Sequence, residues 1–168
     1  RYVASQDMFQ PVALQDVKDA RVLFEDSSHR LWVGTGRDGL YLLDKEHGRL
    51  IQKIPPLQFN HPFQVRKIVE WQPGHLLLAS DEGLTKYDVT TEKVDVIKAD
   101  SRHPEGLNDN YLHELFLDRE NALWIGTYFG GVNYVSSVQD NFRHYHKDNS
   151  QLDARIISVF AHADKNNL

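Results

Sequence analysis

The side chains best suited to metal binding are the nine histidines, of which His144 and His146 stand closest together. Residues two apart in a strand project from the same face, so these two imidazoles would lie side by side. No third ligand follows at a spacing typical of a zinc site. We therefore interpret both as surface histidines and expect neither a metal site nor a cofactor.

Carboxylates occur in neighbouring pairs at Glu25-Asp26 and Asp81-Glu82. Adjacent residues of a strand point to opposite faces, so neither pair forms an acid/base couple for hydrolysis. The sequence has no nucleophile elbow, phosphate-binding loop or His-Glu-x-x-His motif. It also has no cysteine, which excludes disulfides, thiolate zinc sites and thiol catalysis. We expect no catalytic residues.

The net charge and the hydropathy of the chain limit which classes of partner it is expected to bind. The 168 residues carry a formal net charge of -5, with 40% hydrophobic and 26% charged residues, as in an ordinary globular domain. Nucleic-acid binding requires clustered Lys and Arg, so we expect no nucleic-acid partner. No apolar run is long enough to span a bilayer. Any membrane attachment is expected only through a parent protein.

The elements that must position all these side chains repeat along the chain. The segment VLFEDSSHRLWVGTGRDGLYLLD, residues 22–44, is closely similar to ELFLDRENALWIGTYFGGVNYVS, residues 114–136. Trp32 and Trp124 are 92 residues apart, which is two periods of 46. A degenerate copy lies midway, where Leu77 replaces the tryptophan, and a fourth copy begins near Arg155.

Each repeat contains several short apolar runs separated by turn residues. In the first repeat these runs predict strands at 21–25, 31–35, 39–43 and 50–54. A period near 46 with four strands is typical of β-propeller blades. We predict an all-β partial β-propeller with four-stranded antiparallel blades of about 46 residues. The chain would contain about 3.6 such blades. They are expected at residues 20–54, 65–98 and 111–146, with an incomplete blade at 155–168.

Several residue types recur at fixed positions of the repeat, which favours a structural role over a catalytic one. We expect the tryptophans to fill the gap between blades, and the small residues to permit close approach of the inner strands. The aspartates should hold the first turn, and the threonines a strand end. These structural positions are Trp32, Trp124, Gly34, Gly126, Asp26, Asp118, Thr35 and Thr127.

The recurring motif resembles a known family. Leu-Trp-Val-Gly-Thr-x3-Gly-Leu at 31–40 and Leu-Trp-Ile-Gly-Thr-x3-Gly-Val at 123–132, each after an Asp-led turn, are similar to the two-component regulator propeller repeat. The segment Leu-Asn-Asp-Asn-Tyr-Leu at 107–112 resembles the one that introduces such repeats. The second copy lacks both the Trp and the Gly-Thr.

The resemblance implies a function for the parent protein. It implies the periplasmic sensor region of a hybrid two-component histidine kinase, attached to the inner membrane, that detects oligosaccharides and activates carbohydrate-utilisation genes. The phosphate-transferring domains would lie elsewhere in the parent chain.

Loops carry function on propellers, and the loop after the second strand varies most between the copies. Arg37, Asp38 and Asp81 could bind sugar hydroxyls there, and Tyr128 or Phe129 could stack on a sugar ring. We expect these five residues to contact an oligosaccharide ligand.

Two other functions stay open at this point. Propellers also support enzymes that act on polysaccharides, by lyase or hydrolase chemistry, and scaffolds for protein partners. An incomplete stack of blades would expose apolar faces and unpaired strand edges. We therefore expect the remaining blades of a parent chain, or a second copy, to cover them.

Overall fold

The computed structural model describes residues 2–9, 17–45, 47, 49–54, 63–136, 142–146, 148–152 and 156–160. Within these ranges the secondary structure consists of strands, without any helix, and hence without a helix that could cross a membrane. The strands form three four-stranded antiparallel sheets and one short hairpin of β1 (Tyr2–Val3) and β2 (Met8–Phe9). The predicted all-β partial propeller with four-stranded antiparallel blades is confirmed.

Each large sheet is built from four consecutive strands joined by hairpins. Blade 1 contains β3 (Ala20–Glu25), β4 (Leu31–Thr35), β5 (Leu40–Asp44) and β6 (Arg49–Ile54). Blade 2 contains β7 (Val65–Gln72), β8 (His75–Ser80), β9 (Leu84–Asp88) and β10 (Val94–Ile97). Blade 3 contains β11 (Leu112–Leu117), β12 (Leu123–Thr127), β13 (Val132–Val135) and β14 (Phe142–Tyr145).

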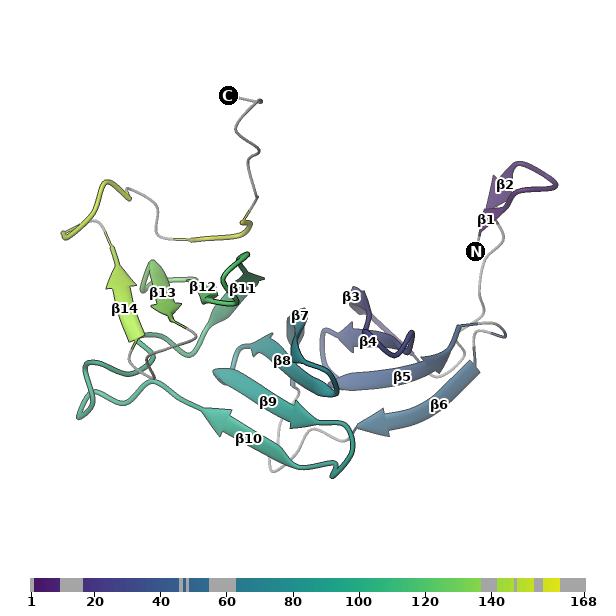
Figure 1. The fold of residues 1–168 in the computed structure, drawn as a ribbon, viewed down its shortest axis with the longest axis horizontal. Coiled ribbons are helices and arrows are strands. Elements are labelled where there is room, and N and C mark those ends of the chain that lie inside the picture. Colours follow the sequence, from purple (N-terminus) through teal and green to yellow (C-terminus); the bar gives the residue numbers. More distant parts are fainter. Residues whose placement is uncertain are drawn as a thin grey trace.

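The three sheets stand side by side like the vanes of a fan (Figure 1). Their first strands, β3, β7 and β11, lie together on the inner side, and β6, β10 and β14 lie on the outer side. Of the strands predicted for the first repeat, 31–35 has the predicted bounds and the others differ by one residue at one or both ends. Residues 156–160 begin the predicted fourth repeat and form no strand in the structure.

Apolar side chains from neighbouring sheets form the core. Between blades 1 and 2 the Trp32 side chain is fully buried, and its ring meets that of Tyr87 edge-on at 5.9 Å. Leu76 and Ile68 belong to the same cluster, in which Val94 is partly buried. The second strand of blade 2, β8, is therefore apolar on both faces because its sheet lies between blades 1 and 3.

Glycine at the inner strands is required by close approach. A Cβ atom on Gly34 would lie 2.5 Å from Cγ1 of Val22 and 2.7 Å from Cγ1 of Val65 in the next blade. A Cβ atom on Gly126 would lie 2.7 Å from the carbonyl oxygen of Ile157. A larger residue at either position would force the inner edges of the sheets apart.

The aspartate that opens the first hairpin binds the tryptophan six residues later. Asp26 is buried, and its Oδ2 accepts hydrogen bonds from Trp32 Nε1 at 2.8 Å and Arg30 Nε at 2.7 Å. Its Oδ1 accepts from the backbone amides of Ser28 and Arg30. Burial alone would raise the pKa of Asp26, but these donors together hold the pKa below its ordinary value.

Blade 3 repeats this arrangement on the face that points away from blade 2. Asp118 Oδ2 accepts from Trp124 Nε1 at 2.8 Å, and Asp118 Oδ1 accepts from the amides of Glu120 and Ala122. Burial would raise the pKa of Asp118, and the bonds from Trp124 and the two amides lower it. Trp124 is half-buried, since it lies on the face of blade 3 that points away from blade 2.

A hydroxyl at the end of the second strand closes the next turn in all three blades. The Thr35 hydroxyl donates to the carbonyl of Gly39 and accepts from the amide of Asp38. Ser80 and Thr127 make the equivalent pairs of bonds in blades 2 and 3. All three hydroxyl-bearing residues are fully buried.

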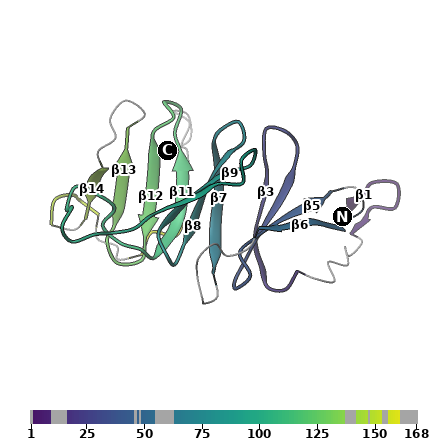
Figure 2. The same ribbon diagram turned by 90° about the horizontal axis from the view of Figure 1, so that it is seen from below.

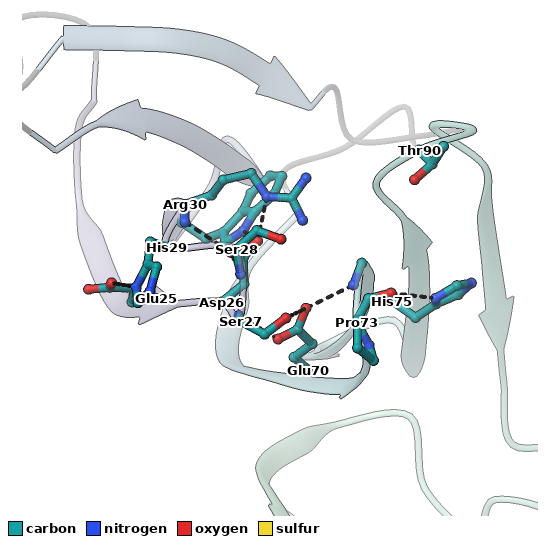
Figure 3. Close-up of polar contacts among 12 residues, drawn as sticks. Glu25, Asp26, Ser27, Ser28, His29, Arg30, Glu70, Pro73, His75 and Thr90 are labelled. Carbon is teal, nitrogen blue, oxygen red and sulfur yellow. Dashed lines mark hydrogen bonds and ion pairs between the residues drawn. The ribbon is translucent and has the colours of Figure 1, made fainter.

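Polar side chains also join one blade to the next. The Glu70 carboxylate of blade 2 accepts from the amide and hydroxyl of Ser27 in blade 1, and from the amide of Gly74 in its own hairpin. Figure 3 shows Glu70 lying between the two hairpins. Blades 2 and 3 are joined by an ion pair of 2.6 Å between Lys67 and the largely buried Glu114.

We predict that an Asp26→Asn substitution lowers the free energy of unfolding by about 2–3 kcal/mol at pH 7, because a charge-assisted acceptor of Trp32 is lost. The hydrogen bonds from Trp32 and Arg30 hold the folded-state pKa of Asp26 below its unfolded value. Its stabilisation is thus complete above the unfolded pKa and disappears as the pH falls through the folded pKa. Urea unfolding from pH 7 to pH 2 measures both effects.

The matched control is Asp118→Asn, where the tryptophan is only half-buried and the expected loss is about 1 kcal/mol. A loss at Asp26→Asn that stays undiminished at pH 2 would show that the carboxylate charge is not what holds Trp32.

Candidate functional site

The loops that follow β4, β8 and β12 lie at the equivalent end of each blade, because all three blades join their four strands in the same order. This end is called the loop face. The residues predicted to bind ligand all lie on it, at 37–38, 81 and 128–129. Figure 2 shows the blades side by side from below.

In blade 1 the loop is bound to the start of blade 2. The carbonyl of Arg37 accepts from the amide of Phe63, and the Phe63 carbonyl accepts from the amide of Gly39. The Arg37 side chain is exposed. The Asp38 carboxylate lies 3.6 Å from Lys53 Nζ, so this carboxylate already has a cationic partner within its own blade.

In blade 2 the predicted ligand residue supports the backbone. Asp81 is partly buried, and its Oδ1 accepts from the amide of Gln64 at 3.3 Å, at the entry to β7. The carboxylates of Asp38 and Asp81 thus bind groups within the protein, and the guanidinium of Arg37 extends into solvent.

Blade 3 gathers three aromatic side chains on the loop face. Phe129 is 69% exposed, and its ring lies 4.7 Å from that of Tyr128 and 6.3 Å from that of Tyr111, each in a T-shaped arrangement. We call Tyr111, Tyr128 and Phe129 the aromatic patch. Sequence reasoning selected the last two and missed Tyr111, which is 51% exposed.

Two polar residues of the segment before β11 fix the patch. The Asp109 carboxylate accepts from the amide of Tyr111 at 3.0 Å and from the amide of Phe129 at 2.8 Å. Its two oxygens therefore hold two of the three aromatic residues at their backbone. The amide of Tyr128 donates to the carbonyl of Tyr111 and joins the segments at 109–111 and 128–129 a second time.

Asn108 connects the patch to the interior of blade 3. Its side-chain Nδ2 donates to the carbonyl of Gly130 at 2.7 Å, and its Oδ1 accepts from the fully buried Asn133 at 2.8 Å. Asn133 returns the contact, because its Oδ1 accepts from the Asn108 amide. The motif at 107–112 was the signal in the sequence for this support, although it did not show which groups are bound.

The geometry favours binding over chemistry. Aromatic rings held by their backbone present large apolar faces at a low cost in conformational entropy, as in a platform for a ring-shaped ligand. His144 Nε2 lies 2.7 Å from the carbonyl of Gly106 and donates to it. Across the described residues, no group of three or more His, Asp or Glu side chains gathers around a metal-sized site.

Comparison with known proteins identifies the segment that supports the patch. Residues 106–129 match the family described as two component regulator propeller. This stretch of the chain is thus similar to a two-component regulator propeller repeat. None of the curated proteins is significantly similar to this chain.

Solved structures share the arrangement of blades. The extracellular domain of the hybrid two-component system BT3049 from B. thetaiotaomicron matches with a TM-score of 0.70 and 19% identity over 85% of this chain and 21% of that one. At that identity the likeness establishes the fold. Two structures of the extracellular domain of BT4673, from the same organism, match with TM-scores of 0.66 and identities of 26% and 25%.

The BT4673 matches cover 80% of this chain and 18% of those chains. The chain thus spans about a fifth of the length of the solved domains it matches.

We predict that an Asn108→Ala substitution loosens the propeller repeat at the patch. It removes the donor to Gly130 and leaves the buried Asn133 amide without that partner, at an expected loss of about 2 kcal/mol in the free energy of unfolding. Hydrogen exchange at the amides of Tyr128 and Phe129 should accelerate relative to the native chain.

Asn110→Ala is the matched control, since the Asn110 side chain accepts from the Ala99 amide instead. Equal exchange rates at 128 and 129 in the native chain and in Asn108→Ala would contradict a supporting role of Asn108.

Proposed function

We propose that the chain is a ligand-sensing propeller segment in the extracytoplasmic, periplasmic part of a hybrid two-component sensor histidine kinase. In this proposal the parent protein regulates carbohydrate-utilisation genes, and the ligand is an oligosaccharide. The chain binds and transmits, and the phosphate-transferring domains belong to other parts of the parent protein.

One observation carries the proposal. The repeat of the two-component regulator propeller family supplies the segment 106–129, and that segment contains the residues that hold the aromatic patch. The likeness to extracellular domains of two-component systems supports an extracytoplasmic sensor. The exposed rings of Tyr128 and Phe129 support a ligand with ring faces, as a sugar has.

The fold also offers a route for the signal. Blades contact one another through buried packing and through ion pairs such as Lys67 with Glu114, so a ligand at one blade changes the energy of its contact with the next. A ligand shifts such a packing equilibrium only as far as it binds one arrangement more tightly than the other. The signal leaves this segment as a change in the packing of blades.

The test is a panel of oligosaccharides, followed by thermal shift and titration calorimetry with the full chain. We expect at least one member to raise the melting temperature, and Phe129→Ala to weaken its binding tenfold or more because the most exposed ring of the patch is removed. Phe9→Ala is the matched control, since Phe9 is 80% exposed on the separate β1–β2 hairpin.

Failure of the whole panel to bind would contradict the oligosaccharide ligand. Binding that is equally strong in Phe129→Ala and the native chain would remove the ligand from the aromatic patch.

A further inference from the structure

Blade 2 differs from its neighbours at the two positions that form the aspartate–tryptophan bond. The pairs Glu25–Leu31 and Glu70–Leu76 are equivalent in blades 1 and 2, although in blade 2 the strands continue to the pair Gln72–His75 past an irregularity at residue 71. Counted from these pairs, Trp71 occupies the position of the aspartate, and Leu77 the position of the tryptophan. The left-handed residue of the hairpin loop is also shared, at His29, Gly74 and Asn121.

The side chains facing Leu77 correspond to those that cover Trp32. In the interface between blades 1 and 2, Trp32 packs against a cross-strand row of Leu76, Tyr87 and Val94. In the interface between blades 2 and 3, the row in the same register is Leu123, Val135 and Phe142. The walls of a space for an indole are therefore present in both interfaces.

The Trp32 indole fills the first of these spaces, whereas the smaller Leu77 side chain, which is 3% exposed, stands at the equivalent place in the second. A groove of about 370 Å³ opens beside Leu77. Its apolar lining includes Trp71, Leu84, Leu123, Val135 and Phe142, and Lys86, Asn121 and Ser136 supply its polar part. An apolar cavity of roughly 150 Å³ is sufficient to bind benzene in another protein. The groove has both the size and the apolar walls for a flat aromatic ring.

A cation stands at the edge of this groove. Lys86 pairs across the sheet with Leu77, in the register position that Leu42 has opposite Trp32 in blade 1. The Lys86 side chain is exposed, and its Nζ lies 5.7 Å from the centre of the Trp71 ring. Lys86 thus stands in blade 2 at the position of the apolar Leu42 in blade 1. Its ammonium group can form an ion pair with an anionic substituent on a bound ring.

We propose that the groove between blades 2 and 3 binds a small aromatic carboxylate of indole size. Its ring occupies the space that the Trp32 indole fills one blade earlier, and its carboxylate contacts Lys86. This site is separate from the aromatic patch and does not depend on the oligosaccharide ligand proposed above.

Indole-3-acetate is the probe, with neutral indole for comparison, and both are titrated into the full ¹⁵N-labelled chain. We expect shifts of the Leu77 amide and the Trp71 indole signals, and binding of indole-3-acetate about two- to fivefold tighter than that of indole, as for an exposed ion pair. Lys86→Met should remove this difference and leave the binding of indole unchanged.

Leu77→Trp places the chain's own indole in the groove and should abolish binding of both probes while raising the melting temperature. The matched control is Leu23→Trp, the same substitution at a position that is 65% exposed on β3, which should leave binding unchanged. Trp71→Ala changes a side chain that is 41% exposed and so tests the site without burial of new volume. It should weaken both probes fivefold or more.

Three results would overturn the proposal: no shift at Leu77 or Trp71 with either probe, undiminished binding in Leu77→Trp or Trp71→Ala, and displacement of the probes by neutral sugars. Equal affinity for indole and indole-3-acetate in the native chain would overturn the assignment of a carboxylate to Lys86.

Discussion

The sheets of this protein hide apolar side chains against one another, and the Trp32 indole is the largest side chain in the contact between blades 1 and 2. A ring of this size carries a polar N–H group into the interface, where an unpaired donor would oppose the packing. The Asp26 carboxylate meets that donor and at the same time closes the hairpin that leads to it. Burial of the interface and closure of the turn therefore depend on one side chain.

The same constraint separates structural from functional residues. The aspartates that accept from tryptophans and amides in blades 1 and 3 are occupied within their own blades. The carboxylates of Asp38 and Asp81 on the loop face are occupied as well. The side chains that remain exposed to a partner include the aromatic rings of Tyr111, Tyr128 and Phe129, and that of Trp71 in the degenerate second blade. Our proposed ligand sites thus lie where the repeats vary and not at the repeated motif itself.

The sequence predicted the fold well because each propeller blade corresponds to one sequence repeat of nearly constant length. Spacing of the Leu-Trp motif determined the blade length, and double-sided apolar runs indicated sheets packed on both faces. The sequence pattern did not predict which individual side chains contact one another. An aspartate precedes a tryptophan by six residues in both blade 1 and blade 3, so this spacing was visible in the sequence. Only the structure shows that the carboxylate accepts a hydrogen bond from the indole N–H. Tyr111 and Trp71 escaped notice because neither side chain recurs at the equivalent position of the other repeats. Contacts between blades, such as that of Ser27 with Glu70, follow no local rule.

Hydrogen exchange of the three indole N–H groups tests the central contact most directly, since the chain has one tryptophan in each described blade. The account predicts the slowest exchange at Trp32, which is fully buried and bound to Asp26, intermediate exchange at the half-buried Trp124, and the fastest at Trp71, which is 41% exposed. Exchange at Trp32 as fast as at Trp71 would show that blade 1 does not pack on blade 2, and the side-by-side arrangement of blades would be wrong.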